Sequence, residues 1–435
     1  MSDHEQQQLA AEMAAISAVK STELVEAAQS AGELNAFQQQ LDESFDRVQD
    51  VKRTLQNVQA YQVTPELAVQ MDADLTAANV VIPVAEGASM VEGAESLGRT
   101  LMPRDFLLTR LTGCENFLSD FFKNSREVVQ RIGSSFKDSY VIFTESQESL
   151  NKSLDILENA VVTHQRFDSK DSFILTHRLF NLFKINGKVD GNWVANLAKL
   201  NSTLNGLSNN YYLNSRKSLD ATYSYFGGFN GLNQEQAESR LKELPVAIPS
   251  VPFKECTYPD NQHGGEGLSS KRSVELMGGA YFFDVRQKRV GGMARDLGEV
   301  EDWITRYLEF DRTGFENNAE YDLNNVGFEI KALTSDEIKG VIRQLRATLK
   351  DWAKIFEQGE RFRILDNDYT DVVKGFLEAD VDEDFKSLLA KHFAAIARKN
   401  QMELLMIRAA VSNYLTLIVN GLVAVCNDSI EINAV

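Results

Sequence analysis

Histidines and cysteines, the residues most often used as metal ligands or nucleophiles, are few and scattered in this 435-residue chain. No two histidines are spaced to face one metal ion from the same helix. Cys256 and His263 are close in sequence, but two further ligands at zinc spacing are missing. We therefore expect no metal site and no catalytic histidine. The histidines are His4, His164, His177, His263 and His392.

Two further patterns resemble ligand-binding loops without completing them. Asn186-Gly187-Lys188-Val189 ends like a phosphate-binding loop, but the leading glycine is absent and Val189 stands where Ser or Thr must reach magnesium. Residues 366–368 and 380–384 have carboxylate spacing similar to calcium loops, yet both lack the central glycine and the closing glutamate. We predict no cofactor and no enzymatic activity. An enzyme with an unrecognised acidic pocket stays open as a third hypothesis, because 63 acidic residues always offer some plausible pair.

The acidic residues are concentrated near the N-terminus. Residues 1–95 hold sixteen Asp and Glu against four Lys and Arg, which is −12 of the total net charge of −18. The same segment contains few aromatic residues, namely Phe37, Phe45 and Tyr61. Such a segment buries little surface by itself, so we expect a coiled coil, a partner-bound helix or partial disorder. Phosphate neutralisation needs basic residues, so the chain is expected near DNA at most, without specific binding.

Helical periodicity is the main structural signal, and in the acidic segment it is firmest over residues 34–58. The apolar residues recur at steps of three or four, which places them on one stripe of a helix. A bundle helix and a docking seam for a partner helix both explain such a stripe, and both interpretations are kept. The stripe consists of Leu34, Phe37, Leu41, Phe45, Val48, Val51, Leu55 and Val58.

The rest of the chain predicts a mainly α fold with four segments. A separable acidic helical leader (1–95) precedes an elongated multi-helix body (96–244), in which residues 104–167 should form two or three long helices. An irregular region (245–330) contains four prolines and a small β-hairpin, predicted where two apolar runs flank Gly278-Gly279. A C-terminal helical bundle (331–435) opens with a capping box of Thr334 and Glu337.

The apolar run Ala409–Cys426 is long enough to be considered as a membrane span. It contains 18 uncharged residues, at the short end of the spanning range. Ser412, Asn413, Thr416 and Asn420 make it polar for a helix that faces lipid. We therefore expect a buried core helix and no membrane. The three cysteines are far apart and odd in number, which indicates a reducing compartment without a disulfide framework.

The stretch Asn79–Pro103 has two prolines, three glycines and no aromatic residue, as an exposed connection would. Within it, Gly93-Ala94-Glu95, followed by Ser96, resembles a cleavage site of the prohead proteases of giant phiKZ-like tailed bacteriophages. Internal head proteins of that group carry acidic propeptides removed after a small-x-Glu tripeptide, and the plan of this chain is similar. The same pattern ends at Glu12, Glu23 and Glu33 in the leader and at several sites in the body, such as Glu127 and Glu337, so exposed backbone is what favours Glu95.

The resemblance implies a virion structural protein of the internal head type. Residues 1–95 would act as a propeptide that targets the chain to the prohead and is cleaved there. The implied partners are other virion or prohead proteins and the prohead protease. The implied location is the inside of the capsid, after assembly in the cytoplasm of the infected bacterium. The alternative function is a helical adaptor or scaffold protein that binds a partner through the stripe at residues 34–58.

Overall fold

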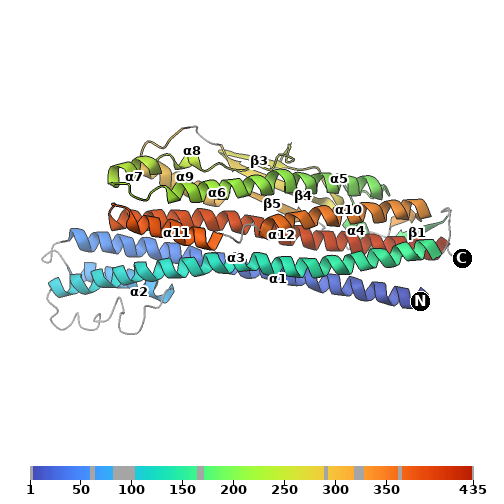
Figure 1. Cartoon of the computed structure of the whole chain (residues 1–435), viewed down its shortest axis with the longest axis horizontal. Helices are drawn as coiled ribbons and strands as arrows, with labels where there is room; N and C mark the ends of the chain where they lie inside the picture. The colour runs from blue at the N-terminus through green and yellow to red at the C-terminus, as the bar shows by residue number, and fades with distance from the viewer. Residues whose placement is uncertain are drawn as a thin grey trace.

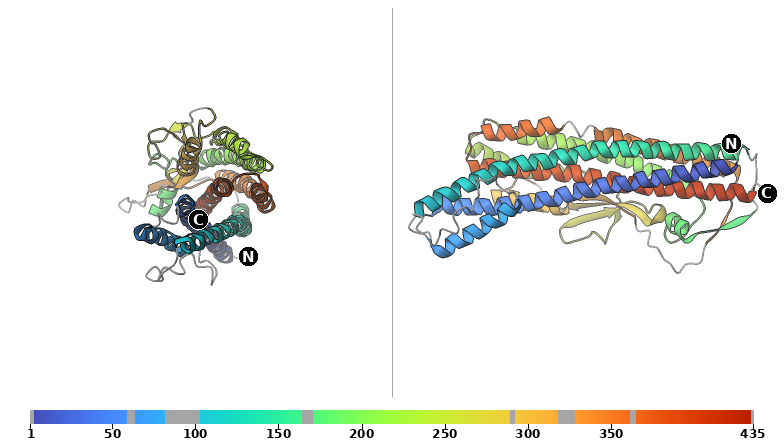
Figure 2. Two further views of the ribbon diagram at one scale, coloured as in Figure 1. Left: turned by 90° about the vertical axis from the view of Figure 1, so that its left-hand side faces the viewer. Right: turned by 90° about the horizontal axis from the view of Figure 1, so that it is seen from below.

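Three long helices run side by side along the whole length of the molecule (Figure 1). They are α1 (Asp3–Asn57), α3 (Pro103–Thr163) and α12 (Glu383–Asn433), and the shorter α2 (Pro65–Val81) packs beside α1. The structure is a computed structural model that describes residues 3–58, 64–81, 103–163, 171–288, 292–317, 328–360 and 365–433. Both ends of the chain lie at the same end of the bundle (Figure 2). The expected mainly α, elongated architecture is confirmed.

The segment predicted to form two or three helices is a single helix, α3. No proline follows Pro103 in this segment, so nothing removes a backbone donor from its interior. One buried stripe also continues along most of its length, with Val128, Ile132, Leu150 and Leu154 each at most 3% exposed. Since α1 offers a partner of similar length, the two helices pack together without a break.

A second layer of helices lies on the other side of α12 (Figures 1 and 2). The helix α5 (Trp193–Gly206) continues through a π-helical segment, η3 (Leu207–Tyr212), into α6 (Leu213–Gly227). The predicted capping box opens α10 (Ser335–Glu360), where Thr334 N donates to Glu337 Oε2 over 2.8 Å. The other helices are α4 (His177–Phe183), α7 (Gln234–Leu241), α8 (Leu244–Ala247), α9 (Leu297–Phe310) and α11 (Leu365–Glu378).

The β structure is larger than the predicted hairpin. An antiparallel sheet has the order β2-β3-β4-β5, and β1 pairs separately with β6. The predicted second strand is β4, but its partners are β3 and β5 rather than residues 274–277, so the predicted pairing was wrong. The strands are β1 (Ser172–Leu175), β2 (Tyr258–Pro259), β3 (Leu268–Arg272), β4 (Ala280–Gln287), β5 (Arg312–Asn317) and β6 (Phe328–Lys331).

The Gly278-Gly279 pair does turn the chain, but within a wider loop. Both glycines have positive φ, of 74° and 69°. The amide of Gly278 donates to Lys184 O over 2.9 Å, and a Cβ at this position would lie 3.1 Å from Leu182 O. The turn, with the short 3-10 helix η4 (Met277–Gly279), is therefore held against α4. Leu276 N donates to Ala280 O over 2.7 Å across the turn, but the strand that pairs with β4 on this side is β3.

The acidic segment is not a separate unit, contrary to expectation. Leu24, Ala28 and Ala31 of α1 belong to the same hydrophobic core as α10 and α12, and each is at most 2% exposed. Small side chains let helices approach closely, so an alanine-rich helix can be a core element without a strong apolar stripe. The expected boundaries at residues 95, 244 and 330 stay predictions, but α1 is packed into the body.

The apolar run Ala409–Cys426 lies within α12, at the centre of the bundle. The helix is long and apolar enough to cross a membrane, and 72% of its most apolar 18-residue window is buried inside the molecule. The polar residues of the run also find partners in the protein, because Trp352 Nε1 donates to Ser412 Oγ over 2.8 Å. The run is thus a core helix of this fold, as expected.

Candidate functional site

The predicted cleavage site, Gly93 to Ser96, lies outside the described residues. The described residues place several competing small-x-Glu tripeptides, and one of these, Gly264-Gly265-Glu266, lies in an exposed loop before β3. Those ending at Glu12, Glu23 and Glu33 lie within α1, and those ending at Glu127 and Glu337 lie within α3 and α10. Helical backbone is protected from proteolysis unless it unfolds locally. These five sites are therefore shielded in the folded chain.

The predicted partner-binding stripe of α1 packs inside the molecule, which corrects its interpretation as a docking seam. Its central residues form a core with α2 and α3, and Leu34 packs against the main core. Phe37 is 36% exposed and Val58 is partly exposed at the end of the stripe. The chain itself covers this stripe, so little of it is available to a partner helix. The buried members are Leu41, Phe45, Val48, Val51 and Leu55.

A line of polar contacts joins α1 to α12 along their antiparallel course, and we call it the α1–α12 seam. Ser21 Oγ donates to Asn413 Oδ1 over 2.7 Å. Farther along, Arg398 Nη2 donates to Asp42 Oδ2 over 3.0 Å, and both side chains are largely buried. The seam comprises the pairs Ser17–Asn420, Ser21–Asn413, Asn35–Arg398, Asp42–Arg398, Asp46–Lys391 and Lys52–Asp384.

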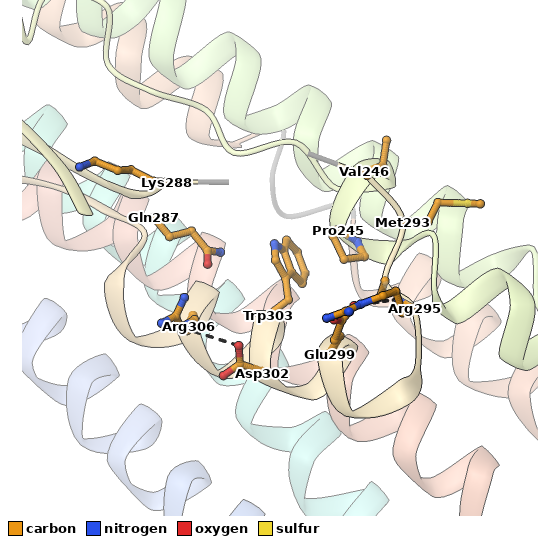
Figure 3. A pocket seen from close by; sticks show the side chains of 12 residues that line it. Pro245, Val246, Gln287, Lys288, Met293, Arg295, Glu299, Asp302, Trp303 and Arg306 are labelled. Carbon is orange, nitrogen blue, oxygen red and sulfur yellow. Dashed lines mark hydrogen bonds and ion pairs between the residues drawn. The ribbon is translucent and has the colours of Figure 1, made fainter. Parts of the chain in front are cut away.

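A cavity with a volume of about 640 Å³ lies between α8, the end of β4 and α9 (Figure 3). The amphipathic helix α9 buries Val300, Ile304 and Tyr307 in the core and leaves Trp303 at the edge of this cavity. Gln287 enters from the last residue of β4. We refer to this space as the α8–α9 cavity.

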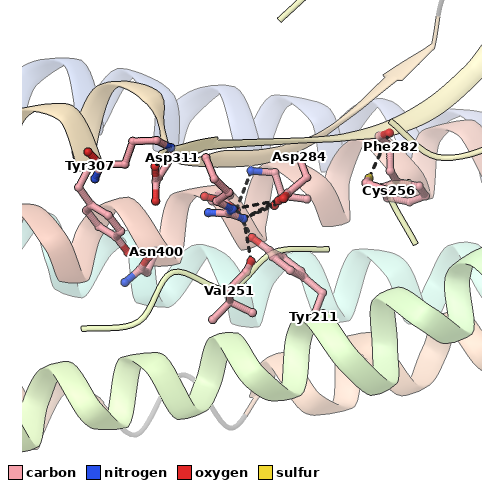
Figure 4. Close-up of polar contacts among 12 residues, drawn as sticks. Tyr211, Val251, Cys256, Phe282, Asp284, Tyr307, Asp311 and Asn400 are labelled. Atoms are coloured by element: carbon pink, nitrogen blue, oxygen red, sulfur yellow. Dashed lines mark hydrogen bonds and ion pairs between the residues drawn. The ribbon is translucent and has the colours of Figure 1, made fainter. Parts of the chain in front are cut away.

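Charged residues gather in a second place, where β4, β5 and η3 meet α12 (Figure 4). The carboxylate of Glu403 accepts a hydrogen bond from the Tyr211 hydroxyl and another from Thr313 N, over 2.8 Å. Lys399 Nζ lies 3.2 Å from Glu403 Oε2. On β4, Arg286 Nη2 donates to Asp284 Oδ1 over 2.7 Å. We call these residues the Glu403 cluster.

Burial perturbs both titratable groups of α12 in the Glu403 cluster. It raises the pKa of Glu403 to about 8, because the charged carboxylate loses its hydration, and the amide of Thr313 partly opposes this rise. It lowers the pKa of Lys399 to about 7 for the same reason, and the Arg286 charge adds to this decrease. Perturbed pKa values often mark active sites, but structural ion-pair networks produce them as well.

The space beside the Glu403 cluster argues for a structural role. The cavity there has a volume of about 20 Å³, enough for about one water molecule and too small for an organic substrate. Asn400 Nδ2 lines it and has no hydrogen-bond partner among the described residues. The hydrogen bonds of the cluster therefore connect the sheet to α12, and the small cavity beside them is no cleft for catalysis.

His263 and Cys256, the one cysteine–histidine pair close in sequence, take separate structural places. His263 Nδ1 lies 2.6 Å from Asp260 Oδ2, and its Nε2 lies 2.8 Å from Glu316 Oε1. These direct contacts leave no room for a metal ion between the atoms. Cys256 donates to Phe282 O, and burial raises the pKa of its thiol. Within the described residues, no group of three or more His, Cys, Asp or Glu side chains is arranged to hold a metal.

Sequence reasoning missed the Glu403 cluster, the α8–α9 cavity and the α1–α12 seam. The members of the cluster come from segments up to 192 residues apart, such as Tyr211 and Glu403, and no local spacing connects them. The one available signal was Lys399 with Glu403, a charged i, i+4 pair directly before the apolar run of α12. Such a pair usually indicates a solvated helix face.

Comparison with known proteins identifies the family. A family model described as phiKZ-like phage internal head proteins matches residues 20–428. The match includes most of the acidic segment together with the whole body, in agreement with the packing of α1 into the bundle. No curated protein and no solved structure matches this chain. Because the family model covers nearly the entire sequence, this chain belongs to the phiKZ-like phage internal head proteins, structural proteins that lie inside the capsid.

Proposed function

We propose that residues 1–95 direct this internal head protein into the prohead, and that a prohead protease cleaves the chain after Glu95. The observation that carries the proposal is the tripeptide Gly93-Ala94-Glu95 in the connection between α2 and α3, within a chain of this family. Two thirds of the net negative charge lies on the N-terminal side of this position. The partners that follow are other prohead or virion proteins and the protease.

Helical structure at five of the alternative sites favours Glu95 over them, whereas Gly264-Gly265-Glu266 lies in an exposed loop and is not shielded in this way. A protease binds extended backbone, and these five small-x-Glu tripeptides lie within helices α1, α3 and α10. A cut inside α1 or α3 would require the longest helices of the bundle to unfold first. The sequence that connects α2 to α3 contains one proline and three glycines, residue types that disfavour a continuous helix.

The packing of α1 changes what cleavage would do. The α1–α12 seam and the core around Leu24, Ala28 and Ala31 hold α1 in the body without the covalent link at Glu95. Cleavage would therefore leave residues 1–95 attached until the bundle opens. Only departure of this segment would reduce the net charge from −18 to −6, and with it the repulsion of DNA packaged nearby.

Mass spectrometry of purified virions tests the proposal. We expect a mature N-terminus at Ser96, and virions made with Glu95→Gln should retain the uncut chain. Glu92→Gln is the matched control, because Met90-Val91-Glu92 lacks a small first residue and its substitution should leave cleavage intact. Virions in which the wild-type chain still begins at its first residues would refute processing at this junction.

A further inference from the structure

The lining of the α8–α9 cavity has an excess of one positive charge in an acidic protein, because Glu299 and Asp302 are ion-paired with Arg295 and Arg306. Its lining includes three cations, Lys288, Arg295 and Arg306, and two anions, Glu299 and Asp302, whereas the whole chain carries a net charge of −18. Its volume of about 640 Å³ lies within the range of small-molecule sites, roughly 300–1,000 Å³. A local excess of positive charge favours an anionic occupant.

Gln287 and Arg306 contribute hydrogen-bond donors to the lining of the cavity. Gln287 Nε2 is buried and has no hydrogen-bond partner among the residues that the structure describes. Arg306 forms a long ion pair with Asp302, with Nε 3.8 Å from Oδ2; the two side chains are 57% and 72% exposed, so solvent weakens this pair. In the view of Figure 3, the Gln287 amide and the end of Arg306 both lie on the same side of Trp303. Together they could hold one anionic group.

An aromatic wall stands beside these donors. The ring of Trp303 lines the cavity and stacks on Tyr307, with centroids 5.1 Å apart and planes inclined by 18°. This stacking fixes the orientation of the indole, and Pro245 adds apolar surface next to it (Figure 3). A fixed indole face beside cationic donors suits a flat ring that carries an anionic group, because stacking and charge-assisted hydrogen bonds then act together.

We propose that the α8–α9 cavity binds a nucleotide, with its base against Trp303 and its phosphate at Gln287 and Arg306. A free mononucleotide and the phosphorylated end of a nucleic acid strand present the same chemistry. The neighbouring Lys288 adds positive charge around the phosphate without being required to contact it, whereas Arg295 is paired with Glu299. This binding is independent of cleavage at Glu95.

Titration of the full-length protein with adenosine 5′-monophosphate tests the assignment. Trp193 and Trp352 are 3% and 0% exposed, so quenching of tryptophan emission reports on Trp303. We expect saturable quenching and one site per chain by calorimetry. Adenosine alone and inorganic phosphate alone should each bind at least about tenfold more weakly, since each lacks one half of the recognised chemistry. A 5′-phosphorylated oligothymidylate that binds more tightly than the mononucleotide would identify a strand end as the source.

Two variants separate specific binding from general charge attraction. Arg306→Gln and Gln287→Leu should each weaken mononucleotide binding about tenfold, with an unchanged circular dichroism spectrum. Arg343→Gln is the matched control, because Arg343 is an exposed arginine on α10 outside the cavity lining. The proposal is overturned if neither nucleotide probe saturates the protein, if phosphate alone binds as tightly as the mononucleotide, or if Arg343→Gln weakens binding as much as Arg306→Gln.

Discussion

Glu403 and Lys399 lie one helical turn apart on α12, and burial moves the pKa of each toward neutrality. A carboxyl group whose pKa is raised on folding contributes stability that is fully present below its unfolded pKa of 4.5. That contribution is lost as the pH rises toward the folded pKa of about 8. For the depressed Lys399, the contribution is present above 10.5 and is lost as the pH falls toward about 7. The two losses of stability overlap near neutral pH, so the combined destabilising effect of Glu403 and Lys399 is largest there.

Glu403→Gln should remove the loss of stability that Glu403 causes as the pH rises. The amide oxygen can still accept from Tyr211 and Thr313, while the titration of the carboxyl group is removed. Between pH 5 and pH 8, the unfolding free energy of the variant minus that of the wild type should increase by about 1.4 kcal/mol per pH unit. Urea unfolding at several pH values measures the difference.

The exposed Glu378, on α11, provides the comparison for this experiment. Glu378→Gln removes the same chemical group at the surface, so its unfolding free energy should follow the wild type across the pH range. Parallel pH profiles for Glu403→Gln and the wild type would show that Glu403 is already ionised in the folded protein.

At the level of helices and strands, α1 shows how one helix uses two kinds of packing. Near its C-terminal end, large apolar residues such as Phe45 pack with α2 and α3, and the Phe45 ring lies 4.6 Å from that of Phe121. Toward its N-terminus, small and polar residues such as Ala28 and Ser21 face the core and α12. The first kind produces a periodic apolar pattern in the sequence, and the second does not.

Phe45→Ala tests whether this helix stabilises the molecule as a whole. Phe45 is 2% exposed, so the truncation should cost about 3–5 kcal/mol of unfolding free energy. Phe37→Ala, on the same helix, removes a side chain that is 36% exposed and should cost about 1 kcal/mol. Denaturant unfolding followed by tryptophan emission reports on the body, because Trp193, Trp303 and Trp352 lie in α5, α9 and α10. Equal midpoints for the two variants would mean that α1 folds independently of the body.

On the scale of the whole molecule, α1 and α12 link the two ends of the chain. The α1–α12 seam pairs residue 17 with residue 420 and residue 52 with residue 384, so it extends over most of the length of both helices. The N-terminal segment is therefore a structural member of the bundle, as well as the carrier of most of the charge. This arrangement separates two events, cutting of the chain and departure of the segment.

Cutting the chain between α2 and α3 should leave a two-chain complex. A recognition sequence for a specific protease, inserted between residues 87 and 88, allows cleavage of the purified full-length protein. We expect both fragments to elute together in gel filtration and to separate only in denaturant, because buried contacts hold α1 in place. Separation of the fragments in native buffer would show that these contacts are too weak to retain the segment.

The sequence by itself determined the helical class, the positions of many helix starts and stripes, and the change in charge near residue 95. These are local properties: Thr334 and Glu337 cap α10 wherever that helix packs, and the stripe of residues 34–58 requires a buried helix face. The resemblance carried by the junction also agreed with the family that the whole chain shows.

Only the tertiary structure showed which element of the protein covers each apolar helix face. An apolar stripe specifies that it must be buried, but its periodicity is the same whether a partner protein or α2 and α3 cover it. Contacts such as Ser21–Asn413 and Tyr211–Glu403 connect residues far apart in sequence through small or polar side chains, which leave no periodic trace. Charge composition therefore suggested a detachable segment, whereas close packing of small side chains makes that segment part of the core.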